Sequence, residues 1–272
     1  MLLITTEHSN AVGSSGTGVR FSTVIFLSFN IGLLAAGIEN SHMLNEADRI
    51  VRGTINHQTK YPKDCSGLSR LSPSGFYIIQ PENGPYLIVL CDMTTEGGGW
   101  TVIQKNTKLN ELTWKATWTT YKFGFGNVQG DHWLGNKYIH QITQQGLYRV
   151  RFIVYNRHNV SSFADYNMFS VNSETEGYRL SLGTYSGTAG DSMNYDRYEQ
   201  DNMKFSTFDR DQDRYGSNCA HSYQGGWWFN NCYRAVLNVR IPYWQTLCCG
   251  NCKGSIILIK PNTDCCPVPR TV

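Results

Sequence analysis

The sequence predicts an α+β fold, in which strands and a few short helices share one core. Runs of β-branched and aromatic residues, separated by turn residues, predict short strands. The two helical patterns do not alternate regularly with strands, which argues against a parallel βαβ sheet. Beyond Tyr185 the chain becomes rich in Gly, Asn and Asp, a composition typical of long loops. Hydrophobic residues make up 40% of the chain, enough to exclude global disorder.

The folded region begins with three predicted strands. Residues 75–80 and 86–91 are β-branched and aromatic runs, and the Pro- and Gly-containing residues 81–85 between them predict a turn. Residues 100–104 form the third run, entered through three glycines that allow positive φ. No Gly-Lys-Ser/Thr follows these glycines, so they do not form a phosphate-binding loop.

Two helices and further strands follow. Helices are predicted over residues 117–123 and 137–144, the second ended by Gly146 as its C-cap. Residues 147–154 alternate between apolar and polar residues and then become continuously apolar, which predicts a strand entering the core. Two shorter strands are expected at residues 168–171 and 178–182.

The N-terminal residues predict export. Arg20 precedes an apolar run at residues 21–36, which ends in small residues, so residues 1–37 resemble a signal peptide. An uncut signal anchor is the alternative, but the run is short and partly polar for a membrane span. Residues 38–60 predict a linker. We therefore expect a secreted, extracellular protein with no membrane span in the mature chain, and a glycosylation acceptor at Asn159.

Export makes disulfides the first interpretation of the nine cysteines. Five of them crowd the C-terminal region, and their pairing stays open: Cys248, Cys249, Cys252, Cys265 and Cys266. The spacing Cys249-x-x-Cys252, followed by Cys265-Cys266, is also compatible with zinc, but export and the lack of a nearby His favour disulfides. Because the count is odd, one thiol is free or pairs with another chain, which allows a disulfide-linked dimer.

Asp209, Asp211 and Asp213 form the sharpest local motif. Carboxylates at alternate positions can converge on one hard cation if the chain curls around it. An EF-hand is excluded, because Arg214 and Ala220 stand where that loop needs Gly and Glu. The alternative to a metal site is a solvated acidic turn.

Composition and motifs exclude two function classes. The chain has 24 Lys and Arg against 21 Asp and Glu, a formal net charge of +3, without the basic face of a nucleic-acid binder. No metalloprotease, nucleophile-elbow or phosphate-loop motif is present, and the seven histidines are scattered, so we expect no enzyme. Gly225 to Phe229 contains adjacent tryptophans, which are core anchors or the wall of a ligand pocket.

Together these segments resemble the fibrinogen C-terminal (fibrinogen-related) domain, and most of all the fibrinogen-like protein 1 group. The matching residues occur in the family's order: 64–65, 74–77, 91–102, 121–127, 133–136, 178–180, 185–191, 203–209 and 218–220. The resemblance implies one domain over residues 61–272. It would comprise a small N-terminal β subdomain, a central mixed or antiparallel sheet with short helices, and a loop-rich C-terminal subdomain that binds calcium and ligand.

The resemblance also implies specific residue roles. The disulfides would be Cys65–Cys91 and Cys219–Cys232. A calcium ion would be bound by the side chains of Asp211 and Asp213 and by the carbonyls of Tyr215 and Ser217. Asp209 would order the loop rather than bind the ion.

A ligand pocket is implied beside the calcium site. Lectin-like members such as ficolins and tachylectins hold acetyl groups with an aromatic residue, a backbone N–H near a cis peptide, and a His. The corresponding positions are Tyr223, the Asn231–Cys232 bond and Tyr233, which replaces the His. The family's usual pocket wall is also replaced, by residues 242–249.

The chain end departs from the family as well. The family continues into a closing strand, whereas this sequence ends at Val272. We therefore expect either a truncated sequence or an open place in the central sheet.

These inferences predict a secreted, non-catalytic, calcium-binding recognition protein for an extracellular protein or receptor. The alternative is a lectin that recognises acetylated glycans in innate immunity.

Overall fold

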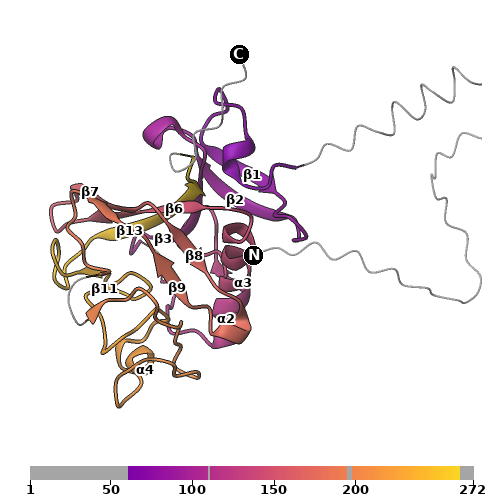
Figure 1. Ribbon diagram of the computed structural model, residues 1–272. Helices are drawn as coiled ribbons and strands as arrows, with labels where there is room; N and C mark the ends of the chain where they lie inside the picture. Colours follow the sequence, from indigo (N-terminus) through magenta and orange to yellow (C-terminus); the bar gives the residue numbers. More distant parts are fainter. Residues whose placement is uncertain (1–60, 110, 195–197, 264–272) are drawn as a thin grey trace, which may run out of the picture. The chain divides into compact units, whose positions relative to one another are not determined.

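The computed structural model describes residues 61–109, 111–194 and 198–263, whose main element is one antiparallel sheet (Figure 1). Its strands follow the order β1-β2-β3-β13-β6-β7-β10, and the short β4 and β5 attach beside β3. The strands are β1 (Gly75–Ile79), β2 (Leu87–Asp92), β3 (Trp100–Asn106), β4 (Phe125–Gly126), β5 (His132–Trp133), β6 (Tyr148–Tyr155), β7 (Ser161–Tyr166), β10 (Tyr185–Gly187) and β13 (Gly254–Pro261). Together with the short helices, this sheet confirms the α+β class.

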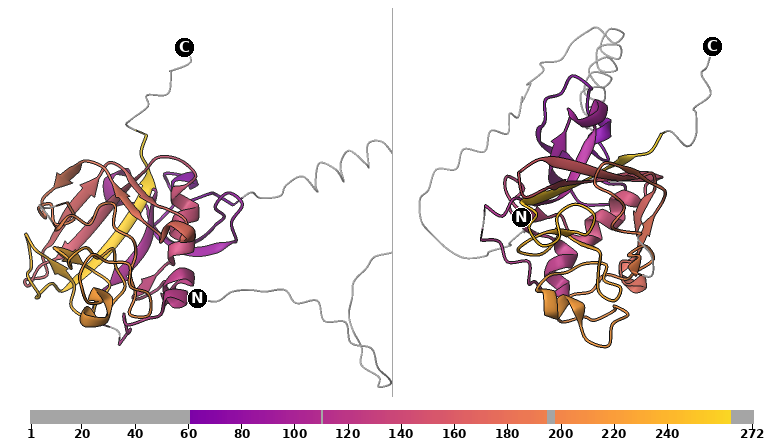
Figure 2. Two further views of the ribbon diagram at one scale, coloured as in Figure 1. Left: turned by 60° about the horizontal axis from the view of Figure 1, so that its bottom comes forward. Right: turned by 90° about the vertical axis from the view of Figure 1, so that its left-hand side faces the viewer.

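The last strand, β13, lies in the middle of the sheet, and Figure 2 shows it in yellow crossing the domain. It pairs with β3 on one side and with β6 on the other. Ile257 and Ile259 belong to the main core, while Leu258 packs with Trp100 on the opposite face. The expected open place in the central sheet is therefore wrong, because the apolar run that begins at Ser255 fills it.

The N-terminal hairpin β1–β2 forms the expected small β subdomain. It meets the rest of the sheet through only two residue pairs between β2 and β3. The predicted disulfide Cys65–Cys91 links β2 to the 3₁₀ turn η1 (Cys65–Gly67), with the two Cα atoms 5.5 Å apart. This covalent link compensates for the short pairing.

In the described part of the chain, three short α-helices accompany the sheet: α2 (Trp118–Phe123), α3 (Asn136–Thr143) and α4 (Cys219–Tyr223). The hydroxyl of Thr117 accepts a hydrogen bond from the N–H of Thr120 and so caps α2. Helix α3 ends at Thr143, and its C-cap is Gln144, whose N–H donates to the carbonyl of His140, so the predicted C-cap at Gly146 is wrong. Helices α2 and α3 pack against each other (Figure 1).

The C-terminal part is loop-rich, as expected, and contains two small ladders. Strands β8 (Phe169–Val171) and β9 (Leu180–Leu182) form one, and β11 (Ala235–Val236) and β12 (Tyr243–Trp244) form the other. Trp227, Trp228 and Phe229 are fully buried, so these aromatics anchor the core rather than wall a pocket.

Some of the expectations concern residues outside the described ranges. They are the signal peptide at residues 1–37, the linker at residues 38–60, and Cys265 and Cys266. In the part of the chain that is described, no helix is both long and apolar enough to cross a membrane.

Candidate calcium and ligand-binding site

The acidic loop is fixed at its start and its middle. Ser206 and Trp227 exchange two backbone hydrogen bonds of 2.9 and 3.1 Å, which hold the strand that enters the loop. Asp209 Oδ1 accepts hydrogen bonds from the N–H of Trp118 at 2.8 Å and from the hydroxyl of Thr207 at 2.7 Å. Asp209 thus joins the loop to α2, the ordering role expected for it.

Asp211 and Asp213 lie together in the following turn. Asp213 N–H donates to Asp211 Oδ1 at 3.2 Å, while the Asp213 carboxylate accepts from the N–H groups of Tyr215 and Cys219, both at 2.8 Å. Burial raises the pKa of the Asp213 carboxyl to about 6, and the Asp211 carboxylate adds to this rise while the two N–H donors oppose it. The two carboxylates repel each other when both are charged, and a cation between them would remove this repulsion.

Two backbone carbonyls of the loop could bind the same cation. Tyr215 and Ser217 are exposed, and their carbonyls accept no hydrogen bond from the described residues. Within those residues, neither Asp211 nor Asp213 has a basic partner within salt-bridge distance. Two carboxylates and two free carbonyls are oxygen ligands of the kind that Ca²⁺ takes. The described residues contain no cluster of three or more His, Cys, Asp or Glu side chains suited to a metal, so backbone carbonyls must complete such a site.

The second disulfide connects the acidic loop to the residues of the predicted ligand pocket. Cys219 begins α4 and is bonded to Cys232, with a Cα–Cα distance of 5.7 Å, as the resemblance implies. The peptide bond between Asn231 and Cys232 is cis. The N–H groups of Cys232 and Tyr233 donate no backbone hydrogen bond within the described part of the chain.

Three tyrosines form an aromatic surface beside this bond. Tyr233 packs edge-on against Tyr223, with ring centroids 4.7 Å apart, and against Tyr243 at 5.2 Å. Tyr223 is 44% exposed, and the buried Phe229 lies behind the cluster. Burial, helped by the two neighbouring tyrosines, raises the pKa of Tyr233 to about 12, so its phenol stays neutral. The surface offers neutral hydroxyl groups and ring edges.

Tyr243 is the member of this surface that the sequence analysis missed. It lies in β12, where Trp244 points into the core and Tyr243 is only partly buried. Residues 242–249, which we expected to replace the family's pocket wall, contribute Tyr243 to the aromatic surface. The alternation of Tyr243 with the apolar Trp244 was the only local signal for it.

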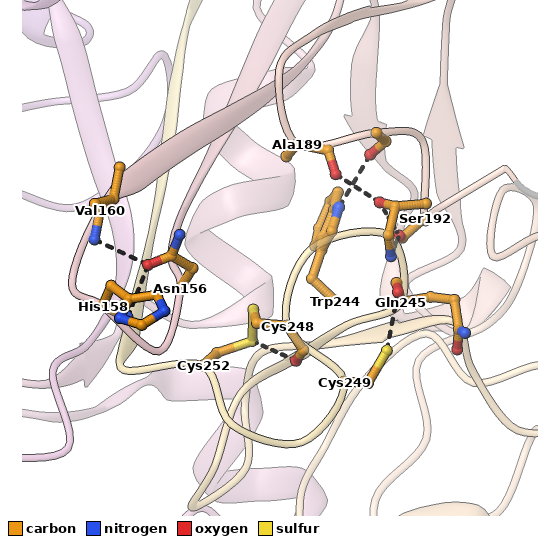
Figure 3. Close-up of a disulfide and its surroundings, with 12 residues drawn as sticks. Asn156, His158, Val160, Ala189, Ser192, Trp244, Gln245, Cys248, Cys249 and Cys252 are labelled. Carbon is orange, nitrogen blue, oxygen red and sulfur yellow. Dashed lines mark hydrogen bonds between the residues drawn. A yellow bond between two sulfur atoms is a disulfide. The ribbon is translucent and has the colours of Figure 1, made fainter.

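The cysteine-rich loop after β12 contains a third disulfide, Cys248–Cys252 (Figure 3). The bond removes Cys252 from any zinc site, so the zinc alternative is wrong for this spacing. Cys249 is free and exposed, and its thiol donates to the carbonyl of Gln245 at 3.0 Å. The same thiol contacts Tyr243: burial raises the pKa of that phenol and the Cys249 side chain raises it further. The free thiol therefore borders the aromatic surface.

Asn159, the predicted glycosylation acceptor, lies in the turn between β6 and β7. The turn is closed by backbone hydrogen bonds from Asn156 to Val160 and from Asn159 to Asn156, both 2.9 Å long. Asn156 Oδ1 also accepts from the N–H groups of His158 and Val160 (Figure 3). Asn159 is exposed, and its position leaves room for a glycan.

Three features together define a fibrinogen-type globular domain. They are the sheet whose central strand, β13, comes last in the chain, the disulfide-linked hairpin β1–β2, and the acidic loop. Residues 61–254 match the family model of the fibrinogen beta and gamma chains, C-terminal globular domain. This chain belongs to that family.

Three relatives show how much of this chain is shared with known proteins. A fibrinogen-like protein 1-like protein from Gallus gallus is 53% identical over 192 residues, which cover 69% of this chain and 68% of that protein. Fibrinogen-like protein 1 of Bos taurus is 42% identical over 64% of this chain and 60% of its own length. Human angiopoietin-related protein 1 is also 42% identical, but only 34% of its length is matched. The chain therefore spans less than two thirds of the last two relatives.

Solved structures have the same fold. The fibrinogen-like globe domain of human ANGPTL2 superposes with a TM-score of 0.68 at 35% identity, covering 74% of this chain and 99% of that domain. Lamprey fibrin D-dimer, complexed with the peptide ligand Gly-His-Arg-Pro-amide, gives a TM-score of 0.68 at 26% identity, covering 82% of this chain and 85% of that chain.

Proposed function

We propose that this chain is a secreted, non-catalytic recognition protein that binds an extracellular protein through the surface formed by Tyr223, Tyr233 and Tyr243. The observation that carries the proposal is the packing of these three tyrosine rings against one another, with Tyr233 directly following the disulfide-bonded Cys232. The fibrinogen-like and angiopoietin-related relatives support a binding rather than a catalytic role.

The chemistry of this surface suits a peptide segment. Tyrosine gives a large, rigid contact area with a polar end, and it is enriched among the residues that dominate binding energy. A backbone N–H beside such rings can donate a hydrogen bond to a carbonyl oxygen of the partner. The peptide bound to lamprey fibrin D-dimer shows that a domain of this fold can hold a short peptide, which supports the same class of ligand here.

A calcium ion, held by Asp211, Asp213 and the carbonyls of Tyr215 and Ser217, would supply positive charge that locks the loop. The ordered loop is connected to the tyrosine surface by this chain's own residues. Asp213 accepts from the N–H of Cys219, and Cys219 is disulfide-bonded to Cys232 in the binding surface. We therefore expect calcium to strengthen ligand binding without touching the ligand.

The test is chemical cross-linking of the purified, secreted chain to cell-surface proteins, followed by mass spectrometry. We expect one saturable partner, lost in the Tyr223→Ala and Tyr233→Ala variants and retained in Tyr86→Ala, a control whose tyrosine is 58% exposed in the connection between β1 and β2. Equal capture by all three variants would contradict the proposed surface. Capture unchanged by a calcium chelator would contradict the role of the ion.

A lectin function is the second candidate, and the cis Asn231–Cys232 bond favours it. The bond stands where the acetyl-binding members of the family have theirs, although Tyr233 replaces the His. Binding to an acetylated-glycan array, measured with calcium and then with chelator, tests this candidate. Calcium-dependent binding that free acetylated sugar competes away would favour the lectin over the protein-binding function.

We also propose that Cys249 links two copies of the chain. Six of the other cysteines form the three disulfides, and the remaining two, Cys265 and Cys266, follow β13. Cys249 is exposed and has no disulfide partner among the described cysteines, so its thiol is available to bond to the same residue of a second copy.

A further inference from the structure

Strand β1 forms one edge of the sheet (Figure 1). It pairs with β2 on one side, and among the described residues no other segment exchanges a backbone hydrogen bond with residues 75–79. The strand contains neither a charged residue nor a proline. Natural edge strands commonly carry such residues, because they prevent another chain from pairing with the edge. The outer edge of β1 is therefore open to pairing.

Two residues of β1 direct their backbone groups toward this edge. The N–H of Gln80, directly after the strand, donates to the carbonyl of Pro62 at 2.8 Å and so points away from β2. In an antiparallel pair, successive residues direct their backbone groups alternately toward the partner strand and away from it. Phe76 and Ile78, which stand four and two residues before Gln80, therefore share its direction. Their N–H and C=O groups form the open edge.

The outer face of the β1–β2 hairpin is apolar. Phe76 lies opposite Leu90, and Ile78 lies opposite Ile88. Phe76, Ile78 and Ile88 are 47%, 40% and 48% exposed, whereas Ile79, which points to the other face, is fully buried in the main core. Antiparallel sheets usually present polar side chains on a face that is open to solvent. The hairpin therefore combines an unpaired edge with an exposed apolar face.

The size of this face indicates a reversible contact. An aromatic side chain buries about 150–250 Å² when it is fully covered, so Phe76 at 47% exposure presents about 90 Å². With Ile78 and Ile88, the exposed apolar area is on the order of 250 Å², about a third of the roughly 800 Å² per partner in a standard interface. Such an area, together with the backbone hydrogen bonds of one strand edge, supports association in the micromolar range rather than a permanent dimer.

We propose that β1 pairs with β1 of a second copy of this chain, antiparallel and about a two-fold axis at Tyr77. This register places Phe76 of each copy opposite Ile78 of the other, so the outward backbone groups of both residues are paired. The exposed side chains of the two hairpins then become neighbours on one face.

The chemistry of the edge favours this occupant. An open backbone edge selects an extended strand, and the uncharged, apolar pattern of β1 selects a strand of the same kind. A second copy supplies both. Because β1 carries no charge, bringing two copies of the strand together causes no charge repulsion between them.

This contact is separate from Cys249. The hairpin meets β3 at Trp100 and Thr101, whereas β13, which follows the Cys249 loop, pairs with β3 from Asn106 onward. These two ends of β3 are about 20 Å apart. Pairing at β1 therefore does not depend on a disulfide at Cys249.

The test is sedimentation velocity of the full secreted chain carrying Cys249→Ser, which removes the cross-link proposed above, from about 1 to about 100 μM. We expect a monomer–dimer equilibrium. Adding Ile78→Lys should raise Kd at least about tenfold, because each dimer contains the new charge twice. Ile241→Lys is the matched control, since Ile241 is 44% exposed but lies between β11 and β12. The control should dimerise like the Cys249→Ser chain.

Hydrogen exchange locates the contact within the chain. Mass spectrometry of the Cys249→Ser chain should show slower amide exchange in residues 75–79 at the high concentration than at the low one. Thermal unfolding of each variant shows that it is folded. A chain that stays monomeric over the whole range would overturn the proposal, as would equal dimerisation of Ile78→Lys or an equal loss in Ile241→Lys. A dimer whose β1 amides exchange as fast as those of the monomer would also overturn it.

Discussion

The carboxylate of Asp213 accepts a hydrogen bond from the backbone N–H of Cys219 at 2.8 Å, which joins the acidic loop to the first residue of α4. Cys219 is in turn bonded to Cys232, the residue before Tyr233 of the tyrosine surface. One hydrogen bond and one disulfide therefore separate the proposed calcium ligands from the proposed ligand contact. This short path explains why the two sites should respond to each other.

The first prediction concerns calcium. Asp211→Ala should remove the calcium-dependent part of the stability and leave the rest, because Asp211 receives only one hydrogen bond, from Asp213 N–H. At a calcium concentration of 100 times Kd, the unmodified chain should gain about 2.7 kcal/mol, and the variant close to none. Calorimetric melting with calcium and with chelator measures both values. Equal shifts in Tm for the two proteins would remove Asp211 from the site.

A second prediction concerns pH and His132. This side chain is 2% exposed, and its burial lowers the pKa of the imidazole. A lowered folded-state pKa contributes stability above the unfolded value of about 6.5, and this contribution is lost as the pH falls below it. The free energy of unfolding in calcium-saturated buffer should therefore fall between pH 7 and pH 5, by at most about 1.4 kcal/mol per pH unit from this residue. Urea titrations provide the values.

His132→Asn is the matched variant, because an Asn amide can replace the Nδ1 contact with the carbonyl of Gly130. Its stability should depend less on pH over the same interval. A decline as steep as that of the unmodified chain would show that another group is responsible.

A third prediction concerns Gly226. A Cβ added there would lie 2.5 Å from the ring of Tyr121, a fully buried side chain, whereas one added at Gly146 would have no atom within 4 Å. Gly226→Ala should destabilise the domain by about 1–3 kcal/mol through overpacking, and Gly146→Ala should change the stability little. Chemical denaturation compares the two variants. A neutral Gly226→Ala would mean that the Tyr121 ring can move aside.

A fourth prediction concerns Cys249. On a non-reducing gel, the secreted chain should run as a dimer that reducing agent separates, and Cys249→Ser should run as a monomer. Because Cys249 is exposed and borders Tyr243, the variant should keep its fold and its three described disulfides. A persistent dimer would assign the cross-link to Cys265 or Cys266, and alkylation of Cys249 in the unmodified chain would show that its thiol is free.

A fifth prediction concerns Asn159. The exposed turn between β6 and β7 should carry an N-linked glycan when the chain is secreted from a eukaryotic cell. Asn159→Gln should abolish the mass shift that an N-glycosidase produces, with little change in Tm. Intact-protein mass spectrometry decides the matter. An unmodified Asn159 in the secreted chain would contradict the assignment.

Local patterns in the sequence determined the class of fold and many of its elements. Alternation and turn residues located β1, β2, β3 and β6, and helix signals located α2 and α3 to within about two residues. The family motifs assigned the Cys65–Cys91 and Cys219–Cys232 bonds, which the structure contains. These features depend on neighbours in the chain or on motifs with fixed spacing, so a sequence can carry them.

Only the tertiary structure decided which distant segments meet. Strand β13 was not identified as a strand from the sequence, and its place between β3 and β6 depends on pairing with strands more than 90 residues away. Tyr243 reaches Tyr233 only because β12 pairs with β11. Such contacts are selected by the burial of the whole core rather than by local preference, which is why the tyrosine surface required the folded chain.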